Sequence, residues 1–169
     1  DQSLNPIVKD LTTQAILRAK SYEITFDNGY RDGDIMMVEG HMQTLIIDYD
    51  ERITLPESVY TRDGYVFVGW RTSDTDYPTF YDKESFRIRD RFSADELEHI
   101  VLIATWLAEE YYIHYEYNGG FSINPDRFTV EDEIILQSAY KENYKFLGWY
   151  MINGQPDTML YTFTVQTEV

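Results

Sequence analysis

Gly64-Tyr65-Val66-Phe67-Val68-Gly69-Trp70 is the stretch that decides the fold, because most of it occurs again as Tyr144-Lys145-Phe146-Leu147-Gly148-Trp149. Both stretches contain Phe-x-Gly-Trp, and both follow an aromatic strand pattern and an Asn-Gly pair. Ordered self-similarity of this kind is the sequence signature of a repeat protein. Stacked repeat units more often present or space a binding surface than enclose a single catalytic cleft, so the repeat disfavours an enzyme.

Alternation of apolar and polar residues predicts the strands around the first motif. Residues 22–27 have the period of a half-buried strand. Residues 64–70 are apolar on both faces, which predicts a central strand, and Gly69 inside it predicts a bulge. Ser93-Ala94-Asp95-Glu96 fits a capping box and predicts a short helix before the last strand of the unit, residues 101–106.

The second copy repeats this order but omits one segment. Residues 112–117 and 144–149 are the strands that correspond to 22–27 and 64–70. The additional segment of the first copy is predicted as a hairpin around Glu39-Gly40. One interpretation is an ordinary edge hairpin that packs on its own unit or its neighbour. The other makes it the candidate partner-binding surface, because methionine side chains are soft and adaptable at binding sites. Its candidate residues are Met36, Met37, Met42 and Leu45.

These markers predict three parts of the chain. Residues 1–20 are interpreted as the tail of a preceding repeat, because Leu17-x-Ala19 matches Leu102-x-Ala104. Residues 21–110 form the first repeat unit with its additional hairpin. Residues 111–169 form a second unit, interpreted as truncated because no Leu-x-Ala-x-Trp follows Trp149.

The order of an aromatic strand, Asn-Gly, Thr54-Leu55-Pro56, Gly-Tyr-x-Phe-x-Gly-Trp and Leu102-x-Ala104-x-Trp106 resembles the Listeria-Bacteroides repeat, also called the internalin B-type B repeat. The resemblance covers most of residues 5–165. In the second copy, Gln137 replaces the proline and Asn143 replaces the first glycine.

The resemblance implies a mainly β (α+β) fold of tandem β-grasp-like units, each a twisted sheet with a short helix. It implies an extracellular bacterial protein, secreted or attached to the cell surface or cell wall, that acts as a spacer or an adhesion and protein-interaction module. The partners it implies are adjacent repeats of the same chain and a protein or other host surface component. It transfers no catalytic residue, and its motif residues are expected to pack in the core: Phe67, Gly69, Trp70, Trp106, Phe146, Gly148 and Trp149.

Composition excludes several classes of partner and cofactor. Thirty acidic and 14 basic residues give a net charge of −16, which repels nucleic acid and anionic membranes. No apolar run is long enough for membrane insertion, and the absence of cysteine excludes thiolate ligation of zinc. No cofactor or metal site is predicted, and Asp27, Asp32 and Asp34 beside glycines are interpreted as a solvated turn rather than a calcium loop.

A carbohydrate-binding module is the alternative function, because such modules stack sugars on exposed aromatic rings. The structural interpretation is that the rings pack in a small sheet core and at its rim. Coplanar exposed rings favour sugar binding, and buried rings favour scaffolding. A small hydrolase is a more distant alternative, since carboxylate pairs meet only in space. The candidate stacking residues are Tyr77, Tyr81, Tyr111, Tyr112 and Tyr117.

Overall fold

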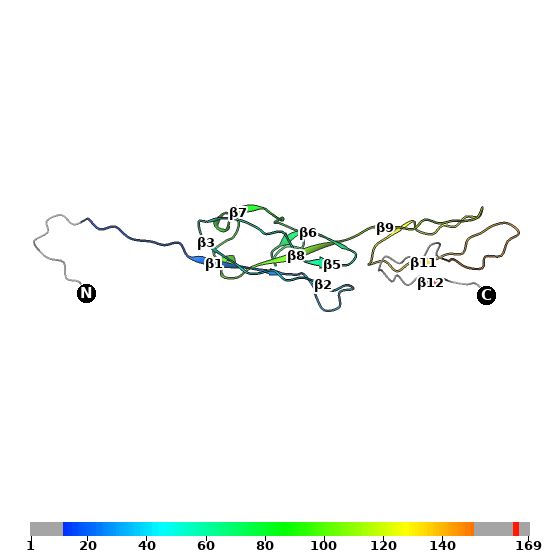
Figure 1. Cartoon of the computed structure of the whole chain (residues 1–169), viewed down its shortest axis with the longest axis horizontal. Coiled ribbons are helices and arrows are strands. Elements are labelled where there is room, and N and C mark those ends of the chain that lie inside the picture. The colour runs from blue at the N-terminus through cyan, green and yellow to red at the C-terminus, as the bar shows by residue number, and fades with distance from the viewer. Residues whose placement is uncertain (1–11, 151–163, 166–169) are drawn as a thin grey trace, which may run out of the picture.

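The computed structural model describes residues 12–150 and 164–165, and it is mainly β with very little helix. We call β1 to β8 the first unit and β9 to β12 the second unit, and the two lie one after the other along the long axis (Figure 1). The elements are β1 (Ser21–Asp27), β2 (Val38–Glu39), β3 (Leu45–Asp48), β4 (Arg52–Thr54), β5 (Thr61–Arg62), β6 (Tyr65–Arg71), β7 (Ser85–Arg87), η1 (Ile88–Asp90), η2 (Glu96–Glu98), β8 (Ile100–Ala108), β9 (Tyr111–Tyr112), β10 (Arg127–Phe128), β11 (Ile135–Leu136) and β12 (Thr164–Val165).

A four-stranded sheet in the order β3-β1-β8-β6 forms the frame of the first unit. The two central strands, β1 and β8, are parallel, with Ile24 opposite Ile100 and Asp27 opposite Ile103. The outer pairs, β1 with β3 and β6 with β8, are antiparallel. The first and last strands of the unit are therefore neighbours at the centre of its sheet.

Strand β6 confirms the predicted bulge but not the predicted central position. The pairing of β6 with β8 shifts register between Phe67 and Gly69. The strand lies at the edge of the sheet, so the prediction of a central strand is wrong. Its second side is covered by a single bridge instead, in which the Trp70 N–H donates to the Phe80 carbonyl at 2.8 Å and the Trp70 carbonyl accepts the Phe80 N–H at 3.0 Å. The bridge satisfies main-chain groups of Trp70 on the edge of β6 that faces away from β8.

Trp70 is the centre of the first core and is fully buried. The rings of Phe26 and Phe67 each lie 4.9 Å from its ring, and that of Tyr60 lies 6.0 Å away. The short β4–β7 pair and the two 3₁₀ turns contribute further apolar side chains to the same cluster. Its largest other buried members are Ile24, Leu55, Phe80, Phe86, Ile88, Phe92 and Leu102.

The predicted short helix is a single 3₁₀ turn, η2. The Glu96 carboxylate accepts bonds from both the backbone N–H and the hydroxyl of Ser93 at 2.6 Å, which is one half of the predicted capping box. These two bonds lower the pKa of Glu96. The residue that caps the turn is Asp95, and its side chain makes no capping bond. Leu97 is buried inside the turn and anchors it to the core.

The predicted hairpin over residues 36–45 is wrong in its pairing. β2 pairs with β5, with Val38 opposite Arg62, while β3 pairs with β1. β3 alternates inward and outward residues as β1 does, so pairing on β1 places Ile47 in the core. The segment between β1 and β3 is thus a long connection that crosses to β5.

The second unit has a smaller core and fewer strands. Phe128, Ile134 and Leu136 are buried and pack with partly buried Trp149. The strand predicted over 112–117 is reduced to β9, and none is assigned over 144–149. β6 pairs with β8 over its whole length, whereas within the described residues 144–149 have no such partner, which explains the missing strand.

Candidate functional site

The four predicted binding residues lie in two different environments. Met42 is buried in the first core, and Leu45 on β3 packs against the same cluster. Met36 is half-buried, and Met37 is 73% exposed beside Ile35, which is 58% exposed. The surface that this segment offers to a partner is therefore the pair Ile35 and Met37, which we call the exposed apolar pair.

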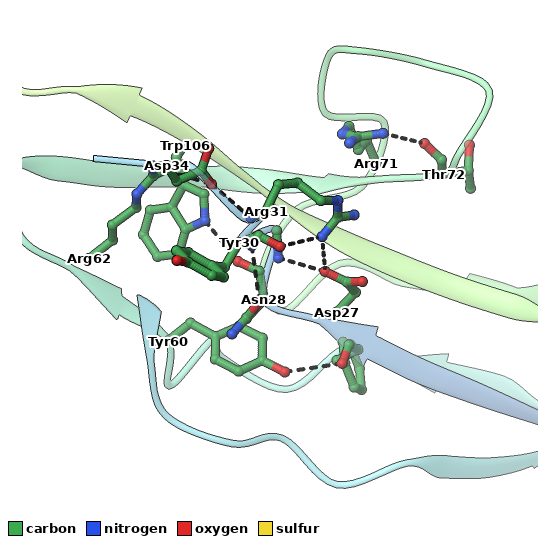
Figure 2. Close-up of polar contacts among 12 residues, drawn as sticks. Asp27, Asn28, Tyr30, Arg31, Asp34, Tyr60, Arg62, Arg71, Thr72 and Trp106 are labelled. Atoms are coloured by element: carbon green, nitrogen blue, oxygen red, sulfur yellow. Dashed lines mark hydrogen bonds and ion pairs between the residues drawn. The ribbon is translucent and has the colours of Figure 1, made fainter. Parts of the chain in front are cut away.

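A network of polar contacts fixes the start of this segment (Figure 2). The Asp27 carboxylate accepts the Gly29 N–H at 2.7 Å and forms an ion pair with Arg31 at 3.1 Å. The Arg31 N–H in turn donates to the Asp34 carboxylate at 2.8 Å. The aspartates interpreted from sequence as a solvated turn thus include two that are held by backbone amides and arginine.

Arg62 connects the segment to the turn between β5 and β6. Its side chain is only 9% exposed. The guanidinium pairs with Asp34 at 3.5 Å and donates from Nε to the Met36 carbonyl at 3.1 Å. It also lies 3.9 Å from the centre of the Tyr65 ring, a cation–π distance. One largely enclosed cation therefore holds three parts of the first unit together.

The motif residues of the first copy pack around Phe67. Its ring contacts Trp70 at 4.9 Å and Trp106 at 5.8 Å in edge-to-face arrangements. The Trp106 Nε1–H donates to the Asn28 carbonyl at 2.9 Å, and the Trp70 Nε1–H donates to Asp82 at 3.2 Å. Each indole thus satisfies its polar group while its ring supports the sheet.

The motif residues of the second copy lie nearer to the surface. Trp149 is half-buried, and its ring lies 5.4 Å from Phe146. Its Nε1–H donates to the Gln137 carbonyl at 2.9 Å. Gly148 has the same φ as Gly69, 142°. Both tryptophans therefore follow a glycine with the same φ, but Trp149 is less deeply buried than Trp70.

A compact joint connects the two units. The Glu109 N–H donates to the Gly64 carbonyl at 2.8 Å, which ties the connector to the first unit. Val130 of the second unit packs on Gly64 so closely that a Cβ there would lie 2.1 Å from Val130 Cγ1. The Tyr65 hydroxyl donates to the Glu131 carboxylate at 3.0 Å. Burial, and then this bond, raises the pKa of Tyr65.

Sequence reasoning alone does not identify the joint residues. It places Gly64 and Tyr65 only at the start of the Trp motif, and the predicted boundary near residue 111 remains a prediction. The sequence signal is the spacing Thr129-x-x-Asp132, which parallels Asp48-x-x-Glu51 and marks a turn after the strand that pairs antiparallel with the first strand of each unit. The shared spacing predicts that a turn of the same kind lies at the corresponding end of each unit.

Ionisable groups do not gather into a metal site in the part of the chain that the structure describes. The three histidines, His41, His99 and His114, are all exposed. Over the same residues, no helix has the length and apolar character required to cross a bilayer.

The chain resembles known proteins in two comparisons. The profile of the Listeria-Bacteroides repeat domain matches residues 22–89 and 111–168. Two proteins of Evansella cellulosilytica are similar: one provisionally named a Gly-rich membrane protein, 28% identical over 145 residues, and one provisionally named a membrane protein, 25% identical over 152 residues. These matches include 83% and 89% of the chain but only 15% and 20% of the relatives. No solved structure matches the chain significantly.

Proposed function

Because the chain belongs to the Listeria-Bacteroides repeat family, we propose that it is a noncatalytic repeat module of a bacterial surface or secreted protein. Its role is to space and orient neighbouring parts of that protein outside the cell. The matched relatives carry membrane-protein names and are several times longer than the chain, which is consistent with such a module.

The joint between the units is the observation that carries the proposal. A short connector, the Gly64–Val130 contact and the Tyr65–Glu131 hydrogen bond act together on a small area. Each contact is weak alone, but the covalent connection gives the partner turn a high effective concentration. A joint fixed in this way maintains the end-to-end distance, which is the property a spacer requires.

The test is a distance measurement between the units. The chain has no cysteine, so spin labels attach only at introduced Glu57→Cys and Glu116→Cys, both exposed positions in different units. We expect a single narrow distance distribution, which Gly64→Ala broadens because its methyl group would displace Val130. Gly33→Ala is the matched control, since Gly33 also has positive φ, 97°, but a Cβ at this position would have no described atom within 4 Å. A broad distribution in the unmodified joint would contradict the spacer role.

We also propose that the first unit is a variant of the β-grasp arrangement. The support is the parallel central pair β1 and β8 with antiparallel strands on both sides. In this variant the 3₁₀ turn η2, which precedes β8, replaces the helix.

Binding of a protein partner is the finer part of the proposal, and the exposed apolar pair of Ile35 and Met37 is its candidate contact. The polar network at Arg62 holds this pair away from the core, which supports such a role. Pull-down of host surface proteins with the chain and with the double variant Ile35→Ser/Met37→Ser tests it. If the chain and the double variant recovered the same proteins in equal amounts, the exposed apolar pair would not be the binding contact.

Sugar binding is the second candidate, favoured by the exposure of Tyr77, Tyr81 and Tyr112. Tyr111 and Tyr117 are half-buried and pack in the second unit. Phe121 and Tyr140 are exposed neighbours, but their planes meet at 62° rather than lying coplanar. A glycan array that binds the chain but not Tyr77→Ala/Tyr81→Ala would place this function first.

A further inference from the structure

The turn that docks on Gly64 in the joint has a counterpart at the opposite end of the first unit. In the second unit, the Asp132 N–H donates to the Thr129 carbonyl at 3.2 Å and the Asp132 carboxylate accepts the Thr129 N–H at 2.6 Å. In the first unit, Glu51 and Asp48 make the same two bonds at 2.9 and 3.3 Å. Both turns follow a strand that pairs antiparallel with the first strand of its unit. We call them the proximal turns.

The proximal turns present equivalent residues. Tyr49 and Asp50 occupy the positions that Val130 and Glu131 occupy in the joint. Val130 is 8% exposed because Gly64 covers it, whereas Tyr49 is 38% exposed. The Asp50 carboxylate pairs with Arg89 and keeps 62% of its surface exposed. Beside this turn lies a hollow of about 400 Å³, lined in part by Tyr22, Tyr49, Phe92 and Leu97.

The other half of the joint is also repeated, at the far end of the second unit. Residues 62–65 and 141–144 form equivalent turns, in which Gly64 and Asn143 have φ of 73° and 63°. Arg62 lies 3.9 Å over the Tyr65 ring, and Lys141 Nζ lies 4.3 Å over that of Tyr144. We call these the distal turns.

The two distal turns differ in whether they are covered. Tyr65 is half-buried and bonded to Glu131, whereas Tyr144 is 70% exposed. The proximal turn of β3–β4 lies at the end near residue 21, and the 141–144 turn lies at the opposite end of the molecule (Figure 1). The chain therefore carries one complete joint and one uncovered half of the same joint at each end.

We infer that these uncovered turns dock another repeat unit of the same kind, head to tail, through the same pair of turns as the Gly64–Val130 joint. The distal tyrosine donates its hydroxyl to the acid of the next proximal turn, and the apolar side chain beside that acid packs on the distal turn, farther from Asn143 than Val130 lies from Gly64 because Asn143 carries a Cβ. The inference rests on the proposed spacer function and names its partner. A contact between unlike surfaces leaves a free half on each partner, so it extends a row of units instead of ending at a pair.

The hydrogen bond of this contact joins a neutral phenol to a carboxylate, so it forms although the chain carries a net charge of −16. Between separate molecules the like charges oppose approach, and salt screens them within a Debye length of about 8 Å at physiological ionic strength. The contact is therefore weak between free copies and effective between covalently connected units.

Disulfide trapping with two copies of the full chain tests the inference. One copy carries Tyr49→Cys and the other carries Asn143→Cys, mixed in equal amounts in high salt under a mild oxidant. In an equal mixture the random share of the 49–143 disulfide is one half of all disulfides. We expect it to outnumber the two same-position disulfides together by about threefold, because docking raises the local concentration of the two thiols. A random share for this pair, and for a second pair with Asp50→Cys in place of Tyr49→Cys, would overturn the inference.

Matched variants define the specificity of the trapping. Replacing Tyr49→Cys by Ile46→Cys, an exposed position on the outer strand β3, is expected to return the mixed disulfide to its random share. Adding Tyr144→Ala to the Asn143→Cys copy is expected to remove the excess, whereas Tyr150→Ala, also exposed, is expected to keep it. Equal effects of the two tyrosine variants would contradict docking through the distal turn.

A disulfide inside one chain shows whether a negative result concerns only the docking of further units or also the proposed spacer function. Gly64→Cys and Val130→Cys in one chain place two thiols at the existing joint, where a Cβ on residue 64 lies 3.1 Å from Val130 Cβ. If this disulfide does not form in a folded chain, the joint and the spacer role both fail. If it forms while the 49–143 pair stays at its random share, only the docking of further units fails.

Discussion

Gly69 and Gly148 have the same φ of 142°, yet only Gly69 is enclosed. A Cβ at Gly69 would lie 2.7 Å from the Phe80 carbonyl oxygen and 2.8 Å from Pro78 Cβ, whereas no described atom lies within 4 Å of a Cβ at Gly148. Alanine strains the backbone at both positions by about 1 to 3 kcal/mol. We predict that Gly69→Ala costs about 1 to 3 kcal/mol more, from overpacking. Urea unfolding of each variant measures the difference, and equal losses would refute it.

Replacement of Trp70 is predicted to lower the free energy of unfolding more than replacement of Trp149. Trp70 is fully buried among three aromatic rings, so Trp70→Ala is expected to remove about 3 to 5 kcal/mol of unfolding free energy. Trp149 is half-buried, and Trp149→Ala is expected to cost clearly less. Circular dichroism during chemical unfolding provides the measurement. A larger loss at Trp149 would mean that the second core is more extensive than its described residues indicate.

Met42 and Met37 separate stability from binding in the additional segment. Met42 is 8% exposed and belongs to the first core, so Met42→Ala is expected to cost about 2 to 5 kcal/mol. Met37 is 73% exposed, and Met37→Ala is expected to change stability by less than about 0.5 kcal/mol. Thermal unfolding of both variants checks this, and comparable losses would show that Met37 packs on the unit.

Arg62 is predicted to control the order of the additional segment. Arg62→Met keeps the apolar stem but removes the bonds to Asp34 and the Met36 carbonyl, with an expected loss of about 2 kcal/mol. Amide hydrogen exchange of residues 31–38 is expected to accelerate. Arg31→Met is the control, because the Arg31 side chain is 54% exposed and its ion pair with Asp27 contributes little. Arg31→Met is expected to leave amide exchange at residues 36–38 unchanged, and faster exchange there would contradict the specific role of Arg62.

Acid is predicted to weaken the proximal turn of the second unit. Bonds from the Thr129 N–H and hydroxyl lower the pKa of Asp132 below its ordinary value of 3.8. The lowered folded-state pKa means that the stabilisation is present above the unfolded pKa and is lost as pH falls through the folded one. An NMR titration is expected to show the Thr129 amide shifting with Asp132 at that lower pH. Thr129→Val removes the hydroxyl bond and is expected to raise the pKa of Asp132, and an unchanged titration would contradict its role.

Local patterns predict the first unit well where they record the period of a buried strand. The alternation of Tyr22, Ile24 and Phe26 indicates β1, and the glycine within residues 64–70 indicates the bulge of β6. The edge position of β6 escapes such patterns because the alternation of side chains reports the two faces of a strand and not which of its hydrogen-bonding edges has a neighbour.

Pairing between distant segments explains the other differences. A glycine between two β-rich runs predicts a hairpin, but Val38 pairs with Arg62 instead, and no local pattern records that choice. Methionine content indicates one binding surface, although the fold buries Met42 and exposes Met37. The joint at Gly64 depends on which residue of a later turn meets it, so it can be recognised only in three dimensions.

The parallel arrangement of β1 and β8 also determines how the first unit responds to mechanical force. The chain enters at the start of β1 and leaves at the end of β8, so these two points lie at opposite ends of adjacent strands. Tension along the molecule pulls the strands past each other and loads the hydrogen bonds between residues 24–27 and 100–103 together, in shear. Bonds loaded together resist force better than bonds opened one at a time. The first unit is therefore expected to resist extension along the line that joins these two points.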